Sequence, residues 1–66
     1  MTKNEWKSLA ERLEAAAVEL QATWTRESDE ALRKGLAPSD KLSNLFARRE
    51  AFIRAALAAR AMEREA

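Results

Sequence analysis

The chain contains one glycine and one proline, and they lie close together near its middle, at Gly35 and Pro38. Glycine readily takes the left-handed conformation found just past a helix end, and proline prevents a helix from running on. Arg33 and Lys34 come directly before the glycine, where cations meet the exposed carbonyls of a helix C-terminus. The sequence therefore predicts two long segments joined by one turn over residues 35–39.

The first segment has the pattern of an amphipathic helix over about residues 4–34. Thr2 and Glu5 fit a capping box at its start. Apolar residues then recur at three- and four-residue spacing, as a helix with one buried face requires. These residues are Trp6, Leu9, Ala10, Leu13, Ala16, Ala17, Leu20 and Trp24.

This apolar pattern is interrupted at residues 25–30, where Glu27 and Ser28 occupy positions that call for apolar side chains. One interpretation is a helix break with Ser28 as a new N-cap. The other is a continuous helix supported by charge pairs four residues apart, such as Glu30 with Lys34. The absence of glycine or proline here favours the continuous helix.

The second segment predicts a helix over about residues 40–65, capped by Ser39 or Asp40. Its main apolar face consists of Leu42, Leu45, Phe46, Phe52, Ile53, Ala56 and Leu57. An opposite strip is also small and apolar, with Ala47, Ala51, Ala55, Ala58 and Met62. This strip is either helix-favouring filler on a solvated face or a close-packing surface for a helix of a sister subunit or target protein.

A five-residue turn forces the two helices into an antiparallel hairpin, with residue i opposite about residue 73 − i. The fold class is thus all-α, and residues 1–66 form one domain. Chains this short usually need disulfides, a metal or self-association, and the sequence has no cysteine or histidine. We therefore expect a homodimer in which two hairpins form a four-helix bundle.

Two polar interruptions of the apolar faces meet in this register, which places Arg49 beside Trp24 and near Glu27. We expect a structural pair of Glu27 with Arg49, whose guanidinium lies against the Trp24 ring. Two alternatives are that Arg49 extends to solvent at the bundle edge or that it binds a ligand or partner.

The candidate partner-binding residues are Trp6, Arg48, Arg54 and Arg60. Trp6 lies near the chain end, where the register leaves nothing opposite it, so it is a plausible anchor for another protein. Arg60 falls opposite Leu13 and has Glu63 three residues later. The arginines point in different directions on the second helix, so they form no aligned basic stripe.

Composition excludes several classes of function. Without histidine, cysteine, tyrosine or a glycine-rich loop, the chain offers no catalytic residues, no cofactor site and no metal site of the usual kinds. The net charge of +1 is far from the basic field of a nucleic-acid-binding protein. No apolar run is long enough to span a membrane, and the first residues lack an apolar signal core, so we expect a cytoplasmic protein.

Three groups of proteins are similar in general layout. The length, the hairpin and the MTK opening resemble the Rop family of plasmid copy-number proteins, which implies an RNA- or DNA-binding dimer. The segment Gly35-Leu36-Ala37-Pro38 is similar to the turn of small co-chaperones of type III secretion needle subunits. Small phage-encoded proteins that bind and disable host regulators or motors share the helix–turn–helix outline.

The sequence favours a non-enzymatic protein-binding module, an adaptor or inhibitor of a host or partner protein that acts through helix-on-helix contacts. The alternative is a Rop-like dimeric RNA- or DNA-binding regulator, and the third interpretation is a small secretion co-chaperone.

Overall fold

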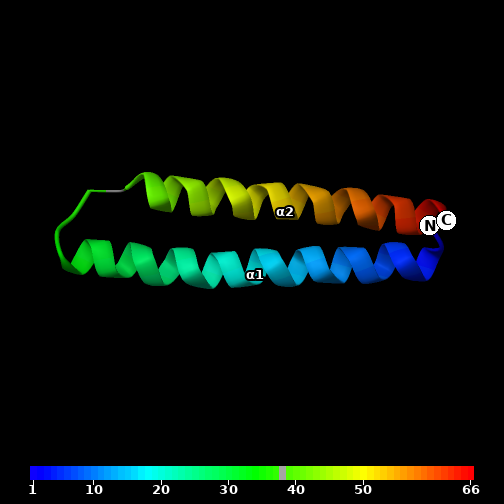
Figure 1. The fold of residues 1–66 in the computed structure, drawn as a ribbon, viewed down its shortest axis with the longest axis horizontal. Coiled ribbons are helices and arrows are strands. Elements are labelled where there is room, and N and C mark those ends of the chain that lie inside the picture. Colours follow the sequence, from blue (N-terminus) through cyan, green and yellow to red (C-terminus); the bar gives the residue numbers. More distant parts are fainter. Residues whose placement is uncertain (38) are drawn as a thin grey trace.

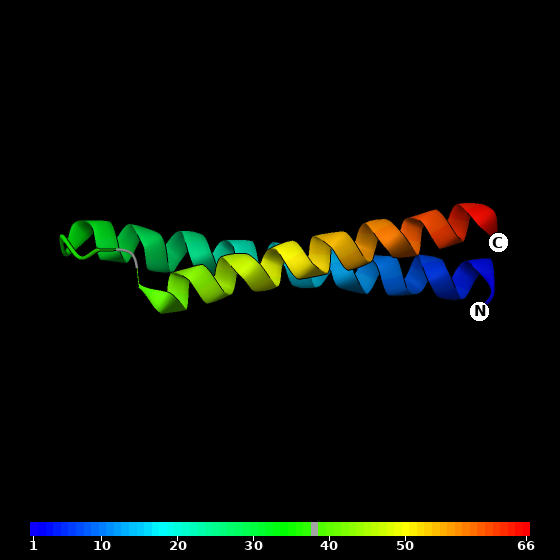
Figure 2. The same ribbon diagram turned by 90° about the horizontal axis from the view of Figure 1, so that it is seen from above.

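The chain is an all-α hairpin of two long helices, as the sequence predicts. The computed structural model describes residues 1–37 and 39–66. Helix α1 runs over Lys3–Arg33 and helix α2 over Asp40–Glu65. They lie antiparallel in a single layer with both chain ends together (Figure 1), and they cross at a shallow angle (Figure 2). The hairpin measures 49 × 14 × 12 Å.

Helix α1 begins at the predicted capping box and continues without a break. The Glu5 N–H donates to Thr2 Oγ1 at 3.2 Å, and the Thr2 N–H donates to Glu5 Oε1 at 3.0 Å. The hydrogen bond from the Thr2 backbone lowers the pKa of the Glu5 carboxyl. The helix passes through residues 25–30, which confirms the continuous interpretation over a new start at Ser28.

Gly35 ends α1 in the predicted way. Its φ of 68° lies in the left-handed region. The Leu36 N–H donates to the Ala31 carbonyl at 2.9 Å, and the Gly35 N–H donates to the Leu32 carbonyl at 3.1 Å. These two bonds form a Schellman motif, which satisfies carbonyl groups left free at the helix end.

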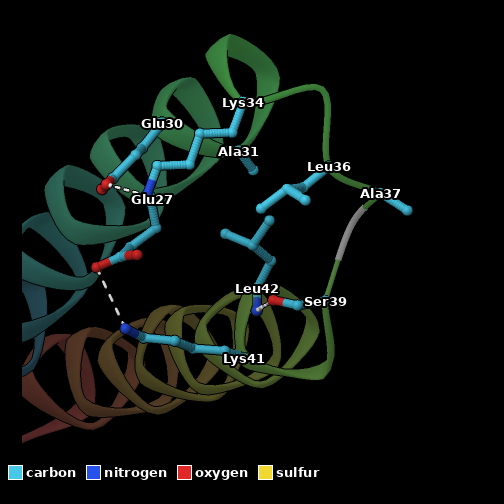
Figure 3. A pocket seen from close by; sticks show the side chains of 9 residues that line it. All are labelled: Glu27, Glu30, Ala31, Lys34, Leu36, Ala37, Ser39, Lys41 and Leu42. Carbon is cyan, nitrogen blue, oxygen red and sulfur yellow. Dashed lines mark hydrogen bonds and ion pairs between the residues drawn. The ribbon is translucent and has the colours of Figure 1, made fainter.

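The next helix begins at Ser39, whose Oγ accepts a hydrogen bond from the Leu42 N–H at 3.4 Å. Ser39, rather than Asp40, is therefore the N-cap. The side chains of Ala31, Leu36 and Leu42 point toward one another inside the turn (Figure 3). The role expected of Pro38 in ending the first helix falls outside the described residues.

The most completely buried positions between the helices are mainly alanines, and larger apolar side chains such as Leu13, Leu20 and Phe52 are half-buried beside them. The buried residues are Ala10 and Ala17 of α1 and Leu42, Leu45, Ala56 and Ala59 of α2. Small side chains let two helices approach closely, but they bury little apolar area. Among residues 1–37 and 39–66, no large side chain is fully buried. The hairpin therefore has a thin core.

Candidate protein-contact face

Several large apolar side chains are exposed on one side of the hairpin. Val18 is 69% exposed, Leu57 66% and Phe46 49%. Phe46, the half-buried Ile53 and Leu57 are seven and four residues apart, a spacing that aligns them along one face of α2. Leu32 follows Val18 by fourteen residues on α1 and is 74% exposed. These residues form an apolar strip that the hairpin itself does not cover.

A groove of about 390 Å³ runs between the helices along this strip. Its lining includes Val18 and Gln21 of α1 and Arg49, Ile53 and Leu57 of α2. Phe46 joins the same surface because the Arg49 guanidinium lies 5.4 Å from the centre of its ring. We call these six residues the contact face: Val18, Gln21, Phe46, Arg49, Ile53 and Leu57.

Charges along this face are paired within the chain. Arg49 Nη1 lies 2.7 Å from Glu50 Oε1. At the edge nearer the chain ends, Arg60 Nη2 lies 2.7 Å from Glu14 Oε1. The hydrogen bonds from Arg60 lower the pKa of the Glu14 carboxyl, and the same pairing raises the pKa of Arg60. Both arginines beside the groove are therefore paired with carboxylates of the same chain.

The expected pair of Glu27 with Arg49 is corrected by the structure. Glu27 Oε1 instead lies 3.2 Å from Lys41 Nζ, and Arg49 pairs with Glu50. The pairing of residue i with about residue 73 − i predicts how far along the hairpin a residue lies. It does not predict on which side of the helix–helix contact its side chain lies. Glu27 follows Gln21 of the contact face by six residues, which turns it about 120° around the helix axis and away from Arg49.

The aromatic partner of Arg49 also differs from the prediction. Its guanidinium lies over Phe46 instead of Trp24. Trp24 is half-buried and lines a neighbouring shallow groove with Ser28, Ser43 and Phe46. Phe46 occupies the position next to the guanidinium because it precedes Arg49 by three residues on the same helix face.

The four candidate partner-binding residues do not share one surface. Trp6 is half-buried near the start of α1, while Arg48 and Arg54 are exposed on α2. Arg48 lines a separate groove with Leu20 and Phe52, and Arg54 follows it by six residues. Arg60 is half-buried, and its guanidinium already contacts Glu14 and Glu63. A role for these residues in binding stays a prediction.

Sequence reasoning singles out the four members of the contact face on α2 and misses the two on α1, Val18 and Gln21. Phe46 and Leu57 were assigned to the main apolar face of the second helix, yet both are exposed at its edge. Val18 was outside the apolar pattern of the first helix, and Gln21 has no distinguishing chemistry. The available signal was angular: Leu57 lies about 100° around the helix from the buried Ala56.

The turn end holds a second, smaller cleft of about 200 Å³ (Figure 3). Two ion pairs line it: Lys34 with Glu30 at 2.9 Å and Lys41 with Glu27 at 3.2 Å. The hydrogen bond between Lys34 and Glu30 lowers the pKa of the carboxyl and raises that of the ammonium. Only the Lys41–Glu27 pair joins the two helices at this end, because Lys34 and Glu30 both belong to the end of α1.

Comparison with known proteins gives no further guidance, since no protein family, characterised protein or solved structure matches the chain.

Within the described ranges, neither helix is both long and apolar enough to cross a membrane. The alanine strip of α2 is exposed at Ala47, Ala51, Ala55 and Ala58.

Proposed function

We propose that this chain is a non-enzymatic protein-binding module, an adaptor or inhibitor that acts through helix-on-helix contacts. In this proposal it works as a homodimer whose two hairpins form a four-helix bundle. The observation that carries the proposal is the contact face, where Val18 and Leu57 are mostly exposed on either side of the half-buried Ile53. Contiguous apolar surface of this kind marks interaction sites on small soluble domains.

Energetics support contact with another helix. Full burial of a valine, leucine or phenylalanine side chain is worth about 1.5–3 kcal/mol relative to exposure. The seam inside the hairpin buries chiefly alanines. The chain therefore has more apolar surface to gain by binding than a hairpin with a leucine-rich seam would have.

Charge supports a protein partner over a nucleic acid. Binding to a phosphate backbone requires a concentration of unpaired cations on one surface. Four of the twelve basic residues, Lys34, Lys41, Arg49 and Arg60, each lie within 3.2 Å of a carboxylate oxygen. The net charge of the chain is +1.

Site-specific photo-crosslinking in host cells tests the function. A photoreactive residue would replace Leu57 on the contact face, and the matched control would replace Ala58, exposed on the alanine strip. We expect protein adducts from position 57 but not from position 58, with a yield that nuclease does not change. Mass spectrometry separates an adduct with a second copy of this chain, which reports the homodimer, from an adduct with a different protein, and only the latter supports an adaptor or inhibitor. An adduct with nucleic acid, or equal protein yields from the two positions, would refute the proposed function.

A salt titration of the captured complex provides an independent check. An apolar helix interface should keep its affinity between about 50 and 200 mM salt, whereas a complex held by phosphate contacts weakens steeply over this range. A steep loss would favour the Rop-like alternative.

A further inference from the structure

We infer that a second copy of this chain packs against the contact face, an assignment that rests on the proposed homodimer and names its interface. The apolar members of this interface are Val18, Phe46, Ile53 and Leu57. Three of them are exposed and Ile53 is half-buried in the single hairpin.

The accessible surface area of the hairpin exceeds that of a compact monomer by about the area that a dimer interface buries on each partner. The hairpin exposes 4960 Å². A compact monomer of the same mass exposes about 4,200 Å², so the excess is about 750 Å². A stable protein interface buries about 800 Å² on each partner. One interface with a second hairpin is therefore of the size needed to bring this chain to the usual ratio of surface to mass.

The shape leads to the same occupant. Stable domains place two packed layers of secondary structure around a core, and this hairpin is a single layer of two helices (Figure 1) whose shortest dimension is 12 Å. A partner helix pair of similar length would supply the second layer. A copy of the chain provides such a pair, with the same 49 Å length.

Self-contact also requires that the surface does not repel itself. In a two-fold dimer the same patch meets on both subunits, so excess charge of one sign would oppose association. Arg49 is paired with Glu50, and Arg60 at the edge is paired with Glu14. Each of these two arginines is therefore balanced by a carboxylate of its own chain and adds no excess charge to the interface.

The alanine strip of α2 is the rival surface for a second copy. Its four alanines, Ala47, Ala51, Ala55 and Ala58, carry only methyl groups, so each has less apolar area to bury than Val18 or Leu57. Its one large side chain, Met62, is 42% exposed, compared with 66% for Leu57. The contact face therefore offers the larger gain on association.

Sedimentation equilibrium of three proteins tests the assignment: the natural chain, Leu57→Glu, and Ala58→Glu as the matched control on the rival strip. We expect the natural chain to dimerise at micromolar concentration. Each dimer would bury two copies of Leu57, so Leu57→Glu should raise the dimer Kd by at least about 100-fold. Ala58→Glu should change it by less than about 3-fold.

A second variant, Val18→Asn, repeats the test from α1, and circular dichroism of each variant reports whether the helices persist. Dissociation by either contact-face variant with its helices intact supports the assignment. A natural chain that stays monomeric at about 100 μM overturns the interface and the proposed homodimer together, while crosslinking to another protein would still stand. A dimer that Ala58→Glu dissociates and the contact-face variants do not would overturn this interface alone.

Discussion

Arg60 of α2 holds Glu14 of α1 through two hydrogen bonds that span 46 residues of sequence. Arg60 Nε donates to Glu14 Oε2 at 3.3 Å, and Nη2 donates to Oε1 at 2.7 Å. A guanidinium that binds both oxygens of one carboxylate fixes orientation as well as distance. This pair joins the two helices on the side nearer the chain ends.

In the described part of the chain, Glu27 with Lys41 forms the other ion pair between helices, and it lies near the turn. Between the two pairs the buried residues are three alanines, Ala17, Ala56 and Ala59, and two leucines, Leu42 and Leu45. The two ion pairs, together with the buried Leu42 and Leu45 near the turn, therefore fix the register.

The Glu14–Arg60 pair predicts a pH-dependent contribution to stability. Because pairing lowers the pKa of Glu14 below its ordinary 4.5, its contribution is present above about pH 4.5 and is lost as the pH falls through the lower folded-state value. At pH 7, Glu14→Gln should lower Tm by a few degrees, and the difference from the natural chain should vanish in stronger acid. Thermal melts followed by circular dichroism from pH 7 to pH 2.5, at one protein concentration, measure this difference in Tm.

Glu11→Gln is the control for this prediction. Glu11 is exposed on the same helix, and among the described residues it has no ion pair. Its substitution should leave Tm nearly unchanged across the same pH range. An equal decrease for both variants would show that net charge, and not the contact with Arg60, determines the effect.

The partners of Glu27 predict which double-mutant cycle shows coupling. Because Glu27 contacts Lys41, the decreases in the free energy of unfolding caused by Glu27→Gln and by Lys41→Met should not add in the double variant. The losses in Glu27→Gln and Arg49→Met should add to within about 0.5 kcal/mol, since these two residues lie on different sides of the seam. Urea denaturation of the single and double variants measures both cycles. Coupling in the second cycle alone would restore the pair expected from sequence.

The hairpin could be predicted from sequence because its signals are local. Glycine at residue 35, the Thr2–Glu5 capping box and the three- and four-residue apolar spacing each act within a turn or two of helix. They predicted both helices and the antiparallel turn. The continuous path through residues 25–30 is favoured by the absence of glycine and proline, but the sequence alone does not decide it because Ser28 also fits a helix N-cap.

The contact face depends on where the seam lies around each helix, which no local signal determines. Ala56 is buried and Leu57 beside it is exposed, although leucine has the greater apolar area. Close approach of the helices favours the smaller side chain at the seam and leaves the larger one at its edge. A ranking of residues by hydrophobicity alone therefore predicts the reverse arrangement.

The buried alanines between the helices predict that a larger side chain destabilises the chain at a buried position but not at an exposed one. Ala59 is 2% exposed, and the neighbouring Ala58 is exposed on the far side of the helix. Ala59→Leu should destabilise the chain by about 1–3 kcal/mol because the added atoms force the helices apart. Ala58→Leu should stay within about 0.5 kcal/mol of the natural chain. Urea denaturation of the two variants compares them, and equal losses would contradict a close-packed seam at Ala59.

The left-handed backbone at Gly35 predicts a loss of stability for any residue with a Cβ, even though there is space for one. No atom lies within 4 Å of a Cβ built at this position, so the cost comes from the φ of 68° alone. Gly35→Ala should lower the free energy of unfolding by about 1–2 kcal/mol. Gly35→Asn should lose less, because asparagine tolerates this conformation better than alanine. Chemical denaturation of the three proteins measures the order, and an alanine variant as stable as the natural chain would show that the turn does not require a left-handed residue.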